Sequence, residues 1–228
     1  MKLLSFDVGI KNLAYCLLNS DMNTIESWGV LNISIDPVCE HIATNKSGMK
    51  ACENSAKHIV EGNCLCASHR KLKAYRDLKA KKVPKPKNAM LEMGTTMVKL
   101  LDSHPEFVEV DLVLIENQPA LKNPTMKSVQ MMVYSYFLVR GVMNSESPMT
   151  SLEMVNARNK LKAYKGPDIP CTIQDRYKRT KHLAIKYCEW MIQENTAISD
   201  EYREMFSSSK KQDDLSDAYL QGMYWIGR

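Results

Sequence analysis

Three apolar runs at the N-terminus place the strongest constraint on the fold of this chain. Residues 2–8 (KLLSFDV), 13–19 (LAYCLLN) and 25–33 (IESWGVLNI) follow one another with only short turns between them. Apolar runs of this length, bounded by turn residues, are typical of β-strands, and short connections favour antiparallel neighbours. We therefore expect the chain to begin with an antiparallel meander of three strands.

The middle and the end of the chain alternate between helical and strand patterns. Apolar residues at helical spacing predict a helix over residues 88–103, and the continuous run at 110–115 predicts a strand buried on both faces. The remaining expected segments are a helix at 124–142, a strand at 149–156, a loop at 157–179, a helix at 180–194, a polar connection of undefined form at 195–211 and a helix at 212–226. A meander followed by alternating strands and helices predicts an α/β fold, a mixed sheet with helices on both faces.

Length and composition fit a single domain, or one domain with a small insert. The chain has 228 residues, of which 44% are hydrophobic and 25% charged, so a sufficient core needs no disulfide framework. A net charge of +5 is compatible with a nucleic-acid partner without requiring one. No run approaches the ~18 apolar residues of a membrane span. The N-terminus is interpreted as a buried strand and not a signal peptide, so we expect an intracellular protein without membrane association.

Residues 36–86 differ in character from the rest and are interpreted as an insert within a domain of residues 1–228. Cys66 and His69 have the C-x₂-H spacing that holds one ion from a turn, and Cys39 and Cys52 would complete a Cys₃His zinc site. Clustering of cysteines with histidines favours a metal over disulfides, and so a reducing compartment. Zinc would be structural, because the segment has few apolar residues. Competing ligand candidates are Cys64, His41 and His58.

Acidic residues stand at the ends of two expected core strands and at the start of the last helix. Asp7 ends the first strand, and Glu116 follows the buried run VDLVLI. A carboxylate at the end of a core strand is costly unless it is paired or binds a metal. Asp214 and Asp217 are three residues apart and share a helix face, and Asp213 lies four residues before Asp217. If the strand ends meet at one sheet edge, these carboxylates come together.

Grouped carboxylates point to divalent cations. At ~4 Å and an effective dielectric of about 20, each like-charged pair costs about 4 kcal/mol, which a bound cation removes. Hard oxygen ligands favour Mg²⁺ or Mn²⁺, and two such ions can stabilise the attacking and leaving oxygens of phosphodiester hydrolysis. Each acid alone has a simpler role: Asp213 and Asp214 can cap the helix, Glu116 can pair with a lysine, and Asp7 can form a turn. Together they favour a two-metal nuclease.

Three motifs resemble those of a known nuclease family. FDVGIKNLAYCLL, IENQP and KKQDDLSDAYLQG are similar to the motifs of RuvC-type Holliday-junction resolvases, in particular the poxvirus and large-DNA-virus family and the related fungal mitochondrial resolvases. The resemblance implies an RNase H-like fold, a homodimer and symmetric cutting of four-way DNA junctions. It also implies Asp7, Glu116, Asp214 and Asp217 as magnesium ligands, with Asp213 competing with or joining Asp214.

The resemblance also has implications for a basic site residue and for the source of the protein. Family members carry a basic residue before the penultimate helix that stabilises charge on the scissile phosphate, which implies Lys181 here, with Lys178 as the alternative. The expected partner is branched DNA, with no small-molecule substrate. Poxvirus members mostly lack a cysteine-rich insert, which favours another large DNA virus as the source, and so the host cytoplasm (virus factory) or nucleus as the location.

Two surfaces each allow two interpretations from the sequence. The basic stretch after the cysteines is either a solvated linker or a DNA contact, and its members are Lys71, Lys73, Arg76, Lys79, Lys81 and Lys82. An apolar stripe on the helix at 124–142 is either core or a dimer surface, and its members are Met131, Met132, Tyr134, Phe137 and Leu138.

Three other classes of function make different predictions for this sequence. An RNase H-like nuclease specific for flaps or RNA–DNA hybrids would use the same acidic residues. An actin-like or sugar-kinase ATPase also carries Asp-x-Gly after its first strand, but 228 residues are too few for its second half. A non-catalytic junction-binding module predicts missing acidic residues, and all are present.

Overall fold

The computed structural model describes residues 1–45, 48–121 and 123–228. Its internal contacts divide the chain into two units, which are described separately. The first unit comprises Met1–Ile33 and Thr96–Arg228, and the second comprises Ser34–Thr95. The insert expected over 36–86 lies within the second unit. Among the described residues, no helix combines the length and apolar character needed to cross a bilayer.

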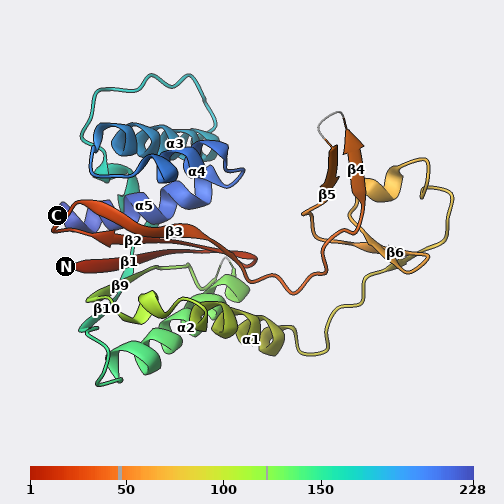
Figure 1. The fold of residues 1–228 in the computed structure, drawn as a ribbon, viewed down its shortest axis with the longest axis horizontal. Helices are drawn as coiled ribbons and strands as arrows, with labels where there is room; N and C mark the ends of the chain where they lie inside the picture. The colour runs from red at the N-terminus through yellow and green to blue at the C-terminus, as the bar shows by residue number, and fades with distance from the viewer. Residues whose placement is uncertain (46–47, 122) are drawn as a thin grey trace. The chain divides into compact units, whose positions relative to one another are not determined.

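A five-stranded sheet forms the centre of the first unit, in the order β10-β9-β1-β2-β3 (Figure 1). Its strands are β1 (Lys2–Val8), β2 (Asn12–Asn19), β3 (Thr24–Asn32), β9 (Leu112–Glu116) and β10 (Ser151–Val155). The first three pair antiparallel, whereas β9 runs parallel to both β1 and β10. The expected meander and mixed sheet are thus confirmed.

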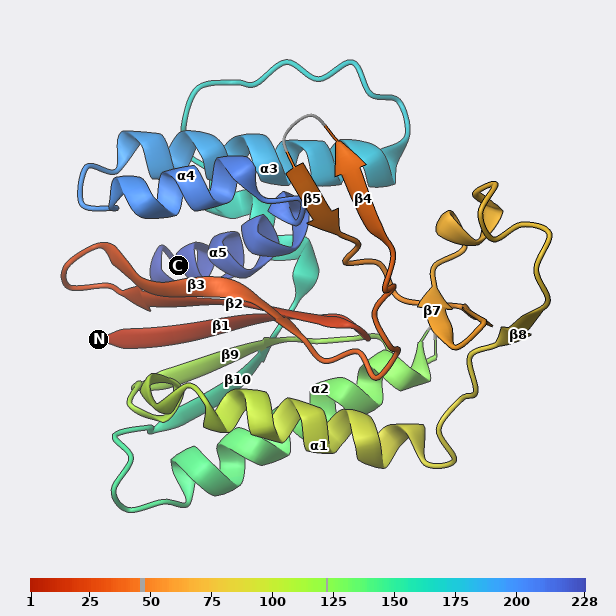
Figure 2. The ribbon, with the colours of Figure 1, turned by 45° about the vertical axis from the view of Figure 1, so that its right-hand side comes forward.

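Helices cover both faces of this sheet, as Figures 1 and 2 show. On one face, α5 (Gln212–Ile226) packs directly on the sheet, and α3 (Arg176–Glu194) and α4 (Asp200–Ser208) pack against α5. The other face is covered by α2 (Pro124–Phe137) and the last turns of α1 (Ala89–Asp102). Leu3, Leu4 and Phe6 of β1 are therefore fully buried, whichever face they lie on. Gly222 lets α5 approach the sheet, because a Cβ there would lie 2.5 Å from Leu18 Cδ1.

The structure differs from the sequence expectation between residues 138 and 208. A π-helix, η3 (Leu138–Val142), continues α2. The expected loop at 157–179 begins with a 3₁₀-helix, η4 (Ala157–Ala163), whose start is capped by Asn156 accepting from the Arg158 amide. Asp175 caps α3 in the same way, so this helix starts four residues earlier than expected. The connection at 195–211 contains α4. Short polar caps, which apolar periodicity does not detect, account for η4 and for the early start of α3.

The second unit consists of small strands around a small core. One sheet pairs β4 (Ile42–Asn45) with β5 (Gly48–Ala51), and the other has the order β7-β6-β8, with β6 at His58–Val60, β7 at Asn63–Leu65 and β8 at Ala80–Lys82. The buried core consists of Cys39, Val60, Leu65 and Cys66. Two of its four members are thiols, so this unit contains few aliphatic side chains to stabilise it.

The basic stretch of the second unit consists of turns followed by β8, and its lysines and Arg76 are exposed. Arg70 lies in the 3₁₀-helix η1 (His69–Lys71), and its guanidinium donates to the carbonyls of Tyr75 and Leu78 at 2.6 and 2.9 Å. These bonds close the loop that precedes β8.

Candidate functional site

In the first unit, three carboxylates surround one ammonium group. Lys160 Nζ lies 2.8 Å from Asp217 Oδ2, 3.2 Å from Asp7 Oδ1 and 3.6 Å from Glu116 Oε2. The Lys160 side chain, on η4, is only 10% exposed. Three of the predicted acidic residues therefore converge on one position, which the Lys160 ammonium group occupies.

Strand register explains why these carboxylates meet. Phe6 of β1 lies beside Ile115 of the parallel strand β9, so Asp7 and Glu116 follow at the same edge of the sheet. Gln221 of α5 donates to Ser5 Oγ and to the Phe6 carbonyl, both at 3.1 Å. These bonds hold α5, and with it Asp217, over the end of β1.

Two buried glutamines join the chain after Glu116 to the end of β1. The side-chain Nε2 of Gln118 donates to the Val8 carbonyl at 3.1 Å, and the backbone N–H of Gln118 donates to Gln130 Oε1 at 2.8 Å. Gln130 belongs to α2 and is fully buried. The spacing of Asp7 and Glu116 is thus fixed by hydrogen bonds from both ends of the strand pair and from a helix.

The protonation equilibria reflect a shortage of positive charge. Burial, reinforced by Asp7, raises the pKa of Glu116 to about 9. Burial also raises the pKa of Asp217 to about 6, although Lys160 opposes it. Burial also opposes ionisation of Asp7, but the Lys160 ammonium and a hydrogen bond from Glu116 together outweigh it, so the pKa of Asp7 lies below its ordinary value. One lysine therefore does not support three ionised carboxylates at neutral pH.

These residues fit a bound divalent cation. The donor set is made of carboxylate oxygens, the hard ligands that Mg²⁺ and Mn²⁺ prefer. The Lys160 ammonium marks the place where positive charge is held, and the raised pKa of Glu116 shows that further positive charge would be stabilised there. The residues that would hold the cation are Asp7, Glu116 and Asp217.

The structure separates the two adjacent acids at the start of α5. Asp214 lines the same cleft as Asp7, and its Oδ2 lies 3.2 Å from Lys211 Nζ. Asp213 instead pairs with Lys181, with 2.6 Å between Oδ2 and Nζ. Burial raises the pKa of Asp214, whereas at Asp213 the effect of burial is outweighed by Lys181 and the pKa is lowered. Asp214 therefore faces the cleft that Asp7 also lines, whereas Asp213 is the ion-pair partner of Lys181.

A cleft of about 630 Å³ opens over these carboxylates. Basic side chains also line it: Arg158, Arg176 and the predicted Lys181. Tyr177 lies at the cleft with 68% of its surface exposed, and Lys181 Nζ is 5.3 Å from its ring centre. Lys178, the alternative to Lys181, is not part of the lining. Acidic and basic side chains thus share one cleft, as binding and cleavage of a phosphodiester require.

Lys160 is the site residue that sequence analysis missed. It lies in the stretch NARNKLKAYK, which contains three lysines at 160, 162 and 165, and nothing in the spacing distinguishes the buried one. Lys162 and Lys165 are exposed. The Asn156 cap was the available signal, because it indicates a helical turn and hence a defined inward face.

In the second unit, the ligand atoms of Cys39, Cys52, Cys66 and His69 all lie within 4.8 Å of one another. Cys39 Sγ is 3.4 Å from His69 Nδ1, and the His69 amide donates to Cys66 Sγ at 3.4 Å. Three thiols and an imidazole are a usual donor set for tetrahedral zinc. The structure therefore brings together the four residues expected from the sequence.

The competing ligand candidates lie outside this group. His41 packs its ring against His69, with centroids 4.1 Å apart, and Cys64 and His58 belong to β7 and β6. Within the group, burial raises the pKa of Cys39. At Cys66 the amides of His69 and Ser68 outweigh burial and lower the pKa, which favours the thiolate that zinc binds.

Sequence comparison finds one viral relative. No protein-family model matches the chain. Uncharacterized protein L451 of Acanthamoeba polyphaga mimivirus is 33% identical over 149 residues. The match covers 59% of this chain and 34% of that protein, so the chain matches about a third of its relative's length.

The structural neighbours are Holliday junction resolvases, as the resemblance implied. The yeast mitochondrial Holliday junction resolvase Ydc2 superposes with a TM-score of 0.53 and 16% identity, over 98% of this chain and 78% of that one. Fowlpox virus resolvase, solved with Holliday junction DNA, gives a TM-score of 0.44 at 16% identity, over 100% and 97%. The similarity to Ydc2 defines the class of fold: an α/β, RNase H-like mixed sheet flanked by helices, as predicted.

Proposed function

We propose that this chain is a metal-dependent endonuclease that cuts branched DNA. One observation carries the proposal: Asp7, Glu116 and Asp217 converge within 3.6 Å of a single cationic nitrogen, in a cleft that Asp214 also lines. The cleft's basic side chains suit an anionic polymer. The fold supports the assignment, because Ydc2, with the same architecture, is a junction resolvase.

Each part of the site has a distinct chemical role in this proposal. Mg²⁺ or Mn²⁺ ions on the four carboxylates would activate a water and stabilise the leaving oxygen, the pattern of two-metal phosphodiester hydrolysis. Lys160 keeps Asp7, Glu116 and Asp217 together by neutralising part of their charge. Lys181, held by Asp213, stabilises negative charge on the scissile phosphate.

The basic and aromatic residues around the acids bind the strand to be cut. Arg158 and Arg176 are exposed and line the cleft, where they contact phosphates. The exposed ring of Tyr177 offers a surface on which a base can stack. A base must leave its pair to stack on Tyr177, and base pairs open more readily at a branch point than within a continuous duplex. The exposed ring therefore favours branched DNA as the substrate.

A four-way junction cut symmetrically by a homodimer is the specific form of the proposal. Its support is the motif resemblance together with the names of the structural neighbours. The dimer surface we propose lies on α2, η3 and the residue that follows η3, where Met131, Val139 and Met143 are exposed by 39, 60 and 72%. Phe137, one of the expected surface residues, is instead fully buried in the core and takes no part in it.

We further propose that Cys39, Cys52, Cys66 and His69 hold a structural zinc ion. The support is their mutual approach and the small aliphatic core of the second unit. The mimivirus relative supports a large DNA virus as the source, with the virus factory or host nucleus as the site of action.

The test compares substrates with the same protein. A four-way junction, a flap, a duplex and an RNA–DNA hybrid are incubated with Mg²⁺ and the full chain, next to Asp7→Asn and Glu116→Gln. The proposal predicts preferential cutting of the junction, and its loss in both variants with DNA binding retained. Preferential cutting of flaps or hybrids would support the alternative RNase H-like nuclease, and cutting that survives either substitution would refute the site.

A further inference from the structure

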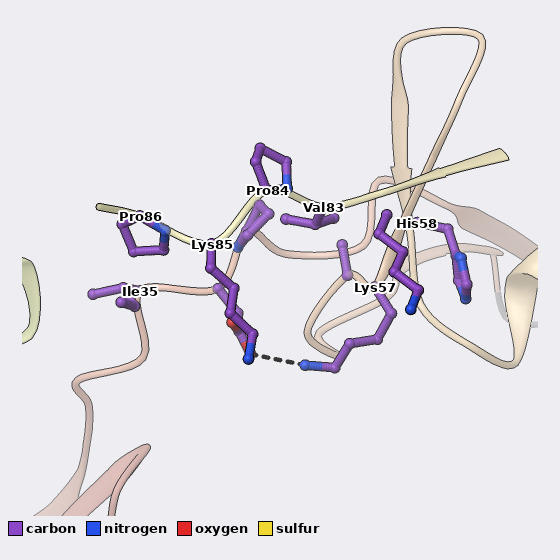
Figure 3. Close-up of a pocket in the computed structure, with 11 residues that line it drawn as sticks. Ile35, Lys57, His58, Val83, Pro84, Lys85 and Pro86 are labelled. Atoms are coloured by element: carbon purple, nitrogen blue, oxygen red, sulfur yellow. Dashed lines mark hydrogen bonds and ion pairs between the residues drawn. The ribbon is translucent and has the colours of Figure 1, made fainter. Parts of the chain in front are cut away.

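The second unit contains a cavity of about 270 Å³ that has no role in the function proposed above (Figure 3). Three segments line it, at residues 35–37, 56–58 and 82–86. The first and last of these are the parts of the chain that lead into and out of the unit's strands. None of the four Cys/His cluster residues belongs to the lining, so the cavity is a separate feature.

Backbone hydrogen bonds hold the three segments together. The Ala56 amide donates to the Pro37 carbonyl at 2.7 Å, and the Val83 amide donates to the Lys57 carbonyl at 3.2 Å. His58 of β6 lies opposite Lys82 of β8 in the antiparallel pair. Ala56 is 1% exposed, so its methyl group closes the inner side. The cavity is therefore a built part of the unit rather than a gap between loops.

The lining combines positive charge with apolar surface. Lys57, Lys82 and Lys85 contribute ammonium groups, and Asp36 is the acidic residue of the lining. Asp36 Oδ2 lies 3.0 Å from Lys57 Nζ, so one of the three ammonium groups is paired and an excess of positive charge remains in the cavity. Figure 3 also shows Pro84 and Pro86 flanking Lys85 on the outgoing segment.

This combination selects the class of ligand. The excess positive charge disfavours metal cations, and the lysines disfavour a wholly apolar molecule. The volume lies just below the roughly 300–1,000 Å³ of sites for drug-sized ligands, so it suits a smaller group. A phosphate with its attached sugar offers an anion for the lysines and an apolar ring for the prolines.

We propose that this cavity binds a phosphate of the DNA backbone, with its deoxyribose against the proline side. The proposal rests on the proposed function, because it takes branched DNA as the ligand. A backbone phosphate carries no sequence information, so the cavity adds affinity and fixes register without selecting a sequence. It assigns a DNA-positioning role to the second unit, through Lys82 and Lys85 specifically rather than through the basic stretch as a whole.

Substitutions within one strand provide a matched test. Lys81 and Lys82 are neighbours in β8, where successive side chains point to opposite faces, and only Lys82 lines the cavity. Lys82→Ala, Lys85→Ala and the control Lys81→Ala are each made in the full-length, zinc-loaded Asp7→Asn protein, so that DNA is bound but not cut. Affinity for a labelled four-way junction is measured by fluorescence anisotropy across a salt series.

The proposal predicts that each cavity substitution weakens binding about fivefold and reduces the slope of log K against log salt by about 0.9, the loss of one phosphate contact. Lys81→Ala should change affinity less than twofold and leave the slope unaltered. Equal losses in all three variants would indicate a diffuse positive field and overturn the proposal, as would no loss in any. Unchanged zinc content and melting temperature confirm that the variants fold.

A second arm distinguishes DNA from a free anion. Inorganic phosphate is titrated against the ¹⁵N-labelled full chain, and the amides of Lys57 and Val83 are followed. Weak shifts at millimolar phosphate, abolished by Lys82→Ala and by excess junction DNA, support the proposal. Tight phosphate binding that DNA does not displace would overturn it. Both arms measure binding, so an uncut junction would refute the nuclease assignment while leaving this result intact.

Discussion

Replacing Lys160 by Met should destabilise the first unit strongly when no divalent cation is present. The ammonium lies 2.8–3.6 Å from three carboxylates, and at an effective dielectric of about 20 each such contact is worth about 5 kcal/mol of Coulomb energy. Desolvation of the ammonium and protonation of Glu116 offset most of this sum. Breaking a buried ion pair from one side typically costs about 3–5 kcal/mol, which is the loss expected here.

Urea unfolding in Mg²⁺-free buffer measures this loss. The three tryptophans, Trp28, Trp190 and Trp225, all belong to the first unit, so their fluorescence reports on that unit alone. With an m-value of about 2–3 kcal/mol/M, the midpoint should fall by about 1–2 M. Lys162→Met is the matched control, because Lys162 lies on the same 3₁₀-helix but is exposed.

Added Mg²⁺ should then recover more stability in Lys160→Met than in the unsubstituted protein. Removal of the lysine leaves the carboxylates in greater need of a cation, and a ligand that binds the folded state stabilises it by mass action. The reasoning is refuted if Lys160→Met and Lys162→Met have the same midpoint without Mg²⁺, or if Mg²⁺ stabilises neither protein.

Three further predictions follow from the geometry. Asp214→Asn should abolish Mg²⁺-dependent cutting, whereas Asp213→Asn, which only removes the partner of Lys181, should slow cutting about tenfold. Equal losses of activity in the two variants would contradict the different roles assigned to Asp213 and Asp214. Cys66→Ser should lose the bound zinc and show faster hydrogen exchange across the second unit, whereas Cys64→Ser should retain one zinc per chain. Native mass spectrometry measures the zinc content of both variants. Gln118→Leu should lower the free energy of unfolding by about 1–3 kcal/mol, measured with urea, because the buried Val8 carbonyl loses its donor; an unchanged midpoint would show that the contact does not contribute.

The parts of the fold that the sequence predicted are those with strong local patterns. The meander and the terminal helix have clear apolar periodicity, and α5 was expected over the same residues, Gln212–Ile226, that the structure gives. The sequence predicted that Asp7 and Glu116 come together if their strand ends meet at one edge of the sheet, and the parallel pairing of β1 with β9 meets that condition. Here local pattern and topology agree.

The parts that were missed depend on packing between segments far apart in the chain. Burial of Lys160 results from the packing of η4 near α5, which no spacing in NARNKLKAYK indicates. Helix α4 lies in a polar stretch, and its buried Phe206 stacks on Trp28 at 5.3 Å. The apolar side of α4 consists of Tyr202, Met205 and Phe206, which spans little more than one helical turn. So short a stripe is a weak periodic signal in the sequence, although its contacts with Trp28 and the core hold the helix in the folded protein.

The zinc ligands show an intermediate case. The C-x₂-H pair of Cys66 and His69 is local and recognisable, but Cys39 and Cys52 are contributed by other segments. The Cys39 amide bonds to the Asn54 carbonyl and the Cys52 amide to the His41 carbonyl, both across the unit. Only these tertiary contacts favour Cys52 over Cys64, which the sequence left as a competitor.

The most direct test of the central claim is cleavage of a mobile four-way junction, labelled in turn on each strand, with the full chain and Mg²⁺. The account predicts paired nicks at equivalent positions on two opposing strands, dependent on Mg²⁺ and abolished in Asp7→Asn, which still binds the junction. No cleavage, or cleavage that persists in Asp7→Asn or without a divalent cation, would contradict it.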